Sequence, residues 1–168
     1  RSVEAKKEQI LTGFEWEQLL SEYPVVVADK RKYYIESNRS HYNHAHHSEG
    51  LDVAEQIIAE KYPEYSAAFT KVCNRTWAHM FNMFVMRRDL FDQYCEWMFS
   101  ILEEIEKRVD ISGYDMYEAR IYGFVSEILL DVWLEANNIN YKEQNVSFME
   151  PQNWLKKGGL FLKRKFFK

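Results

Sequence analysis

Several signals that would assign an enzyme class directly are missing from this sequence. Its only two cysteines, Cys73 and Cys95, form no CxxC pattern, so neither a zinc site nor a disulfide framework is indicated, and we expect reduced thiols in a cytosol. There is no glycine-rich phosphate loop, no GxSxG and no Asp-x-Asp. Apolar runs such as YPVVVA and GFVSEILL are far shorter than a membrane span. These absences argue against a P-loop enzyme, an α/β-hydrolase and a membrane-spanning chain.

The chain does have enough apolar and aromatic residues for a real core. Its 168 residues are 46% hydrophobic and 16% aromatic, which is typical of one folded domain. The charge is uneven, because residues 151–168 carry six basic and no acidic side chains, and without them the formal net charge falls from −4 to −10. We therefore expect residues 1–150 to form a single, partial domain and residues 151–168 to form a basic aromatic tail.

The tail suggests a contact with a surface. Between positions 154 and 168 its aromatic and leucine side chains are interleaved with lysine and arginine, a composition that suits an interfacial anchor on an anionic membrane. The alternatives are a frayed end or a segment that packs on a neighbouring subunit.

Hydrophobic periodicity predicts a mixed α/β chain that is mostly helical with a few short strands. Thr12 followed by Glu15 matches a capping box, and Pro24 closes the helix that they open. The run VVVA predicts a buried strand. Residues 29–50 show neither period, so we expect a long ordered loop ended by Gly50. Further helices are predicted over 51–62, 63–73, 89–109 with Asp89 as its cap, and 114–137, and further strands over an interior run 80–86 and a late run 139–149.

The last long helix carries a polar stripe between apolar flanks, formed by Arg120, Gly123, Glu127 and Asp131. A carboxylate in such a stripe is partly buried, and its pKa is raised unless Arg120 offsets the burial. That is how a general base is tuned. The alternative is a structural network of arginine and carboxylates on an inward-facing helix.

Clustered cations and tyrosines lie in residues 30–39. The cluster comprises Lys30, Arg31, Lys32, Arg39, Tyr33 and Tyr34. Guanidinium groups grip phosphate oxygens and aromatic rings stack on flat faces, which suits a diphosphate, a nucleotide or a sugar. Nucleic acid is disfavoured, because a body of charge −10 repels a phosphate backbone. A solvated loop is the alternative.

Four of the five histidines fall in the stretch SHYNHAHHSEG. We expect His41 and His44 to line a polar pocket. The alternative is a metal site built from His44, His47 and Asp52 (or Glu49), although no HExxH accompanies it. His79, in an apolar stretch, is expected to be a hydrogen-bonded core residue.

Four stretches together resemble a known family: DKRKYYIESNRSHYNHAHH, AHMFNMFVMRRDLFDQYCEWMF, YEARIYGFVSEILLDVWLE and NWLKK. The family comprises bacterial capsular and exopolysaccharide biosynthesis proteins, catalogued as a domain of unknown function and generally described as glycosyltransferases, some as galactosyl- or galactofuranosyltransferases. The resemblance covers most of residues 11–168. It implies a variant of the GT-A nucleotide-sugar transferase fold, of which this chain is the C-terminal, acceptor-side portion.

In that family a further N-terminal stretch ends in an His-Tyr-Arg-Arg-Tyr-like motif, so we expect any Mn or Mg bound with the nucleotide sugar to have its ligands outside this chain. The run MFNMFVM is similar to a strand near the donor sugar in many glycosyltransferases, although Met83 stands where a small residue is expected.

The leading hypothesis is a glycosyltransferase that moves a sugar from a nucleotide-sugar donor to a lipid-linked saccharide, in the cytoplasm or on the inner face of the plasma membrane. Glu127 is the expected base, oriented by Arg120, with Asp131 in reserve. Phosphate is expected at Lys30, Arg31 and Arg39, and the sugar pocket is expected to be lined by Tyr33, Tyr34, His41, His44 and Asn82. The alternatives are a non-catalytic helical interaction module and a His-based metal-dependent hydrolase.

Overall fold

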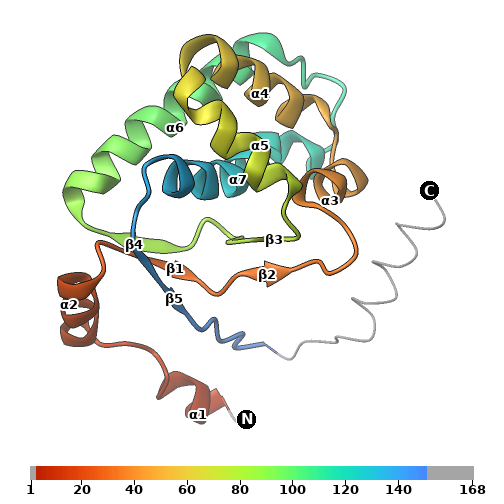
Figure 1. Cartoon of the computed structure of the whole chain (residues 1–168). Coiled ribbons are helices and arrows are strands. Elements are labelled where there is room, and N and C mark those ends of the chain that lie inside the picture. Colours follow the sequence, from red (N-terminus) through yellow and green to blue (C-terminus); the bar gives the residue numbers. More distant parts are fainter. Residues whose placement is uncertain (1–2, 151–168) are drawn as a thin grey trace.

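The computed structural model describes residues 3–150 and shows a mixed α/β fold (Figure 1). Its helical elements are α1 (Val3–Lys7), α2 (Gly13–Glu22), α3 (Asn38–Ala45), α4 (Glu49–Lys61), the 3-10 turn η1 (Pro63–Tyr65), α5 (Ser66–Asn74), α6 (Arg88–Arg108), the 3-10 turn η2 (Glu118–Arg120) and α7 (Ile121–Ala136). Its strands are β1 (Val25–Ala28), β2 (Arg31–Lys32), β3 (Trp77–Ala78), β4 (Phe84–Met86) and β5 (Tyr141–Gln144).

The strands form one layer made of two small sheets. In the three-stranded sheet β1 is central, antiparallel to β4 and parallel to β5. The second sheet pairs β2 with β3 in antiparallel register, Arg31 opposite Ala78. Helices α4 to α7 gather over one face of this layer, whereas α1 and α2 lie on the other side (Figure 1). All four residues of β1 are buried, because this strand is flanked on both edges and covered by helices.

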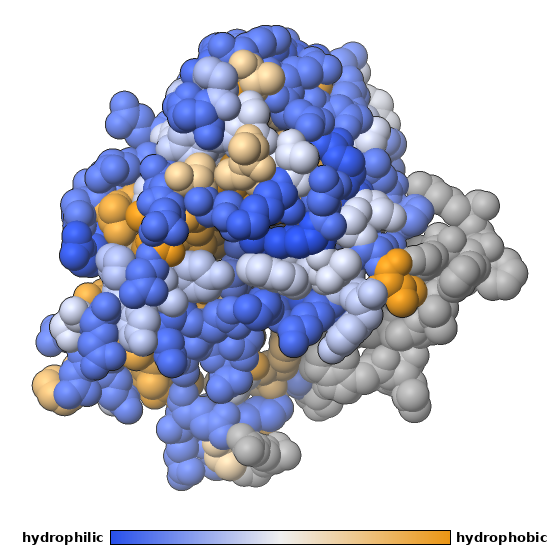
Figure 2. Space-filling view, viewed as in Figure 1, coloured by the Kyte–Doolittle hydropathy of each residue, from blue (hydrophilic) through white to orange (hydrophobic). Residues whose placement is uncertain are grey.

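Helix α7 is the centre of the core. Ten of its residues are buried, and it contacts α4, α5 and α6. Burying apolar side chains from four helices against one another supplies the main favourable free energy of folding. The surface seen in Figure 2 is largely hydrophilic and carries small hydrophobic patches. The exposed large apolar side chains of α6 are Phe91 and Phe99. Within residues 3–150, no helix is both long and apolar enough to cross a bilayer.

Local sequence signals placed most elements correctly. The capping box is present: Glu15 accepts from the backbone of Thr12 at 2.8 Å, and the Thr12 hydroxyl accepts from the amide of Glu15. The buried strand β1, the helices α4 to α6 and the late strand β5 are also confirmed.

The predicted loop over residues 29–50 is wrong, since this segment contains β2 and α3. Ser37 caps α3 by accepting from the amide of Ser40 at 3.2 Å, and Tyr42 buries its ring in the core. Gly50 does not end the segment but lies inside α4, where an added Cβ would stand 2.5 Å from the side chain of Ile121. The glycine permits this close contact between the first turns of α4 and α7.

Three other boundaries also differ. Strand β4 is short and lies at the sheet edge, because left-handed backbone at Phe81 and Asn82 breaks the run that was predicted as an interior strand. Arg87 occupies the N-cap position of α6 without a side-chain capping bond, while Asp89, the predicted cap, lies in the first turn and pairs with Arg87. Helix α7 starts at Ile121 because the carboxylate of Asp115 accepts from two following amides and closes a separate turn. The predicted basic tail, 151–168, lies outside the described residues.

Candidate functional site

Glu127 lies half-buried on α7, on the side that faces α3 and the turn before β4. Burial raises the pKa of its carboxyl, while a backbone hydrogen bond from Phe81 and the positive charges of Arg120 and Arg31 partly offset the rise. A carboxylate with a raised pKa at the edge of a cavity can accept a proton near neutral pH.

Two arginines lie near this carboxylate. The guanidinium of Arg31 is 5.4 Å from the ring centre of Tyr33, and that of Arg120 is 5.3 Å from the ring centre of Phe124. Within residues 3–150 neither guanidinium forms an ion pair or hydrogen-bonds Glu127. Arg120 therefore acts on Glu127 through its charge rather than by the direct orientation expected from the sequence. Two guanidinium groups left without a carboxylate are available to an anionic ligand.

Below Glu127 lies a narrow cavity of about 10 Å³, lined by Tyr33, Asn38, His41, Tyr42, His46, Met80, Phe124, Glu127 and Ile128. Such a volume holds one water molecule and no sugar ring. The cavity is therefore too small for a sugar, and the exposed side chains of Arg31 and Arg120 lie near Glu127 but outside the cavity lining.

The histidine cluster is organised by Glu36, a residue that the sequence analysis missed. Its carboxylate is only 2% exposed and lies 2.7 Å from Nδ1 of His41 and 3.1 Å from Nδ1 of His44. The ring of His41 also stacks on Tyr33 at 4.0 Å. The i, i+3 spacing of the two histidines and an acidic residue just before the helix could have indicated this arrangement. The structure thus places His41 on the cavity wall, whereas His44, which was also expected to line the pocket, is not among the lining residues.

The structure does not bring together the alternative metal set of His44, His47 and Asp52. His47 lies 2.9 Å from Glu118, and Asp52 lies 2.7 Å from Arg39. Across the described part of the chain, no three His, Cys, Asp or Glu side chains are grouped to hold a metal ion. Each candidate ligand instead has its own ionic or hydrogen-bonded partner.

Of the predicted phosphate-binding cations, Lys30 and Arg39 already have acidic partners. Lys30 lies 2.5 Å from Glu143 and over the ring of Trp77. Arg39 bridges Asp52 and Glu55 at 2.7 and 2.6 Å. Tyr34 is 81% exposed on left-handed backbone. Of the residues predicted to bind phosphate, Arg31 is the one that lies near Glu127 and has no acidic partner among the residues that the structure describes.

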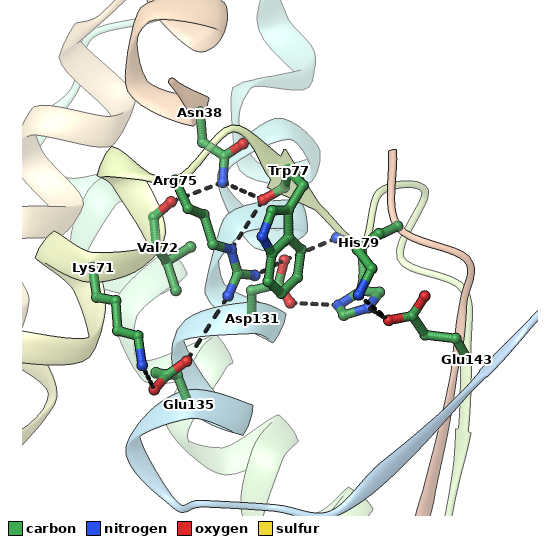
Figure 3. Close-up of polar contacts among 10 residues, drawn as sticks. Asn38, Lys71, Val72, Arg75, Trp77, His79, Asp131, Glu135 and Glu143 are labelled. Atoms are coloured by element: carbon green, nitrogen blue, oxygen red, sulfur yellow. Dashed lines mark hydrogen bonds and ion pairs between the residues drawn. The ribbon is translucent and has the colours of Figure 1, made fainter. Parts of the chain in front are cut away.

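Asp131, the second carboxylate of the predicted stripe, belongs to a buried ionic network (Figure 3). It lies between Arg75 and His79, at 2.6 Å from each, and also accepts from the backbone amide of His79 at 2.8 Å. Burial opposes ionisation, but His79 and Arg75 together hold the pKa of Asp131 below its ordinary value. With 2% of its side chain exposed and both carboxylate oxygens paired, Asp131 is much less accessible to a substrate hydroxyl than Glu127. His79 is confirmed as a hydrogen-bonded core residue.

Asn82 lies beside Glu127 but is tied to the protein. Its amide donates to the hydroxyl of Ser126 at 2.9 Å and to the carbonyl of Gly123 at 3.2 Å. Both partners lie on the first turns of α7, so Asn82 joins the turn before β4 to the helix that carries Glu127.

The fold resembles part of a known protein, and the sequence matches a known family. The apo structure of the bifunctional glycosyltransferase WbbM is similar to this fold, with a TM-score of 0.74 and 27% sequence identity. The likeness covers 77% of this chain but 24% of WbbM, so the chain spans about a quarter of that protein. No curated protein sequence matches significantly. The sequence profile of the domain of unknown function DUF4422 matches residues 1–138. Because that match covers far more than half of the chain, this protein belongs to the DUF4422 family.

Proposed function

We propose that this chain provides the acceptor-activating part of a glycosyltransferase, with Glu127 as the general base. The observation that carries the proposal is a half-buried carboxyl with a raised pKa, next to two arginines that have no acidic partner within residues 3–150. The similarity to part of WbbM supports the same class of reaction.

The chemistry assigns a separate task to each group. An acceptor hydroxyl attacks the anomeric carbon of a nucleotide sugar and gives its proton to Glu127. The bond from that carbon to the diphosphate breaks, and the negative charge that develops on the diphosphate is stabilised by Arg31 and Arg120. His41 and Tyr33 form the wall beside the base. In this mechanism Lys30, Arg39 and Asp131 stabilise the fold and do not contact substrate.

The partners follow from the same chemistry. The donor would be a nucleotide sugar, with galactose or galactofuranose as the first candidates, and the acceptor a lipid-linked saccharide of a capsule or exopolysaccharide. Because the described residues contain no set that fits a metal ion, any Mn or Mg that accompanies the donor would be bound outside them. A cytoplasmic location on the inner membrane face fits such an acceptor.

Titration calorimetry of UDP and UDP-galactose, with and without manganese, tests the proposal on the native protein and on Glu127→Gln. We expect the variant to retain nucleotide binding while transfer to a saccharide acceptor falls by roughly 10²- to 10⁴-fold, the typical contribution of a general base. Absence of any nucleoside diphosphate binding would reject the proposal and favour a non-catalytic helical interaction module.

A further inference from the structure

The small cavity next to Glu127 has a lining that is partly apolar and partly polar. The apolar part includes Met80, Phe124 and Ile128, and the polar part includes Tyr33 and Asn38 together with Glu127. The volume of about 10 Å³ matches the space that one buried water molecule needs. Because the cavity is so small, each side chain in its lining lies within contact distance of whatever occupies it.

Asn38, the first residue of α3, has one amide atom left for the cavity. Its side-chain nitrogen donates to the carbonyls of Val72 and Trp77, both at 2.8 Å. A carbonyl only accepts, so these two bonds fix which end of the amide is nitrogen. The amide oxygen is buried and accepts from no residue among 3–150. Asn38 is 2% exposed, so bulk solvent does not supply a donor to this oxygen.

The hydroxyl of Tyr33 is the second polar group of this kind at the cavity. One face of its ring stacks on His41 at 4.0 Å, and the guanidinium of Arg31 lies over the ring at 5.4 Å from its centre. The hydroxyl, at the ring edge, is buried and bonds to no residue in the part of the chain that the structure describes. Burial raises the pKa of Tyr33 to about 12, so the hydroxyl keeps its proton at neutral pH and can donate.

Together with Glu127, these groups match the hydrogen-bonding pattern of one water molecule. Tyr33 offers a donor, and the amide oxygen of Asn38 and the carboxylate of Glu127 offer acceptors. A buried water typically makes about three such bonds, and leaving buried polar groups unpaired is unfavourable. Tyr42 also lines the cavity, but its hydroxyl lies at the first turn of α4, 3.0 Å from where a Cβ on Gly50 would stand.

We propose that this cavity binds one ordered water molecule, which accepts from the hydroxyl of Tyr33 and donates to the amide oxygen of Asn38 and to the carboxylate of Glu127. The inference deepens the proposed function and rests on it only for its catalytic meaning. A water bonded to the buried side of the carboxylate fixes its orientation and leaves the exposed side for an acceptor hydroxyl. Tyr33 and Asn38 are then positioning residues, which act on Glu127 through the water.

A crystal structure of the native full chain, at a resolution that shows ordered waters, is the direct test. We expect density for one water within about 2.5–3.2 Å of the Tyr33 hydroxyl, the Asn38 amide oxygen and the Glu127 carboxylate. A cavity without such density would overturn the proposal. This measurement needs no substitution, so it decides even if a variant does not fold.

Tyr33→Phe and Tyr94→Phe form a matched pair for a test in solution. Each change removes a buried hydroxyl that bonds to no residue within 3–150, but Tyr94 is not part of the cavity lining. Removing a hydroxyl that has no partner should not lower the urea midpoint of unfolding, whereas removing one that holds a buried water should lower it. We therefore expect a lower midpoint only in Tyr33→Phe. Equal midpoints in the two variants would overturn the proposal.

The titration of Glu127 separates a positioning water from one that only stabilises the fold. Carboxyl-carbon NMR reports the pKa of Glu127 without any substrate. This pKa should rise in Tyr33→Phe, because a more weakly held water gives less support to the charged carboxylate, and should stay unchanged in Tyr94→Phe. An unaltered Glu127 titration in folded Tyr33→Phe would reject the positioning role.

Activity measurements separate this inference from the proposed function. Density for the water in a native protein that shows no sugar transfer would leave the water site intact and reject the transferase. Transfer by a native protein whose crystal structure lacks that water would retain the transferase and overturn the water site.

Discussion

Nδ1 of His79 lies 2.6 Å from Oδ1 of Asp131, and the two residues are 52 positions apart in the chain. This pair joins the end of β3 to α7 in the interior. It also distinguishes Asp131 from Glu127, the other carboxylate on the same face of α7. Asp131 is enclosed by His79 and Arg75, whereas Glu127, one turn earlier, has neither partner. Asp131 therefore stabilises the fold, whereas Glu127 is the candidate for chemistry.

Replacing Asp131 by asparagine should destabilise the protein strongly. The change leaves Arg75 and His79 buried without their carboxylate, which typically costs about 3–5 kcal/mol in the free energy of unfolding. Urea denaturation at pH 7 measures the loss. Asp92→Asn is the control, since Asp92 forms an exposed pair with Arg88 and its loss should cost about 1 kcal/mol or less.

The stability lost in Asp131→Asn should depend on pH in one direction. Because the pKa of Asp131 is lowered on folding, its stabilising effect is present above the ordinary value of 3.8 and is lost as the pH falls through the folded pKa. The stability difference between native protein and Asp131→Asn should therefore shrink in acid. A difference that is constant from pH 7 down to pH 2 would contradict the network.

Glu127→Gln should stabilise the protein although it greatly slows transfer. The pKa of Glu127 is raised on folding, so the stability that comes from the protonated carboxyl is lost as the pH rises from 4.5 through the folded pKa. At pH 7 the neutral amide of Gln avoids that loss of stability. We therefore expect the free energy of unfolding to rise by about 0.5–2 kcal/mol, the usual range for a stabilising substitution.

Thermal unfolding at pH 7 and at pH 3.5 checks this expectation, since the gain should largely vanish at the lower pH. Glu103→Gln, on the exposed face of α6, serves as the control and should change little. A Glu127→Gln variant less stable than the native protein at pH 7 would mean that the carboxylate is favourably paired.

Arg31→Ala and Arg39→Ala should differ in their effects on UDP affinity and on stability. Arg31 has no acidic partner among residues 3–150 and lies near Glu127, so its loss should weaken UDP binding by about 1.5–3 kcal/mol, the net value of hydrogen bonds to charged groups. Arg39 is held by Asp52 and Glu55, so its loss should leave binding unchanged and reduce stability slightly. Calorimetric titration of both variants with UDP measures the two affinities. Equal losses of affinity would mean that both arginines reach the phosphates.

Glu36→Gln should weaken the attachment of α3. The buried carboxylate holds two histidines, and an amide cannot accept equally well from both, so we expect a loss of about 1–3 kcal/mol in unfolding free energy. His44→Ala should cost less, because His44 is 39% exposed. Urea denaturation compares the unfolding free energies of the two variants. An unchanged unfolding free energy in Glu36→Gln would show that the cluster adds no stability.

Much of the fold was predictable because its signals are local. The Thr12–Glu15 capping box, the β-branched run of β1 and the apolar periodicity of α6 and α7 each depend on neighbours within a few residues. Helix α3 escaped prediction because it is short and polar, and tertiary contacts such as the burial of Tyr42 against the core and the bonds from the Asn38 amide to the carbonyls of Val72 and Trp77 stabilise it.

The sequence by itself determined the classes of side chain available and the helix face that carries Glu127 and Asp131. Only the tertiary structure decided which charges remain free. Asp131 is paired with Arg75, which follows α5, and with His79, which follows β3, and Arg39 is paired with residues of α4. Burial and ion pairing depend on contacts between distant segments, and no periodicity in the chain encodes them.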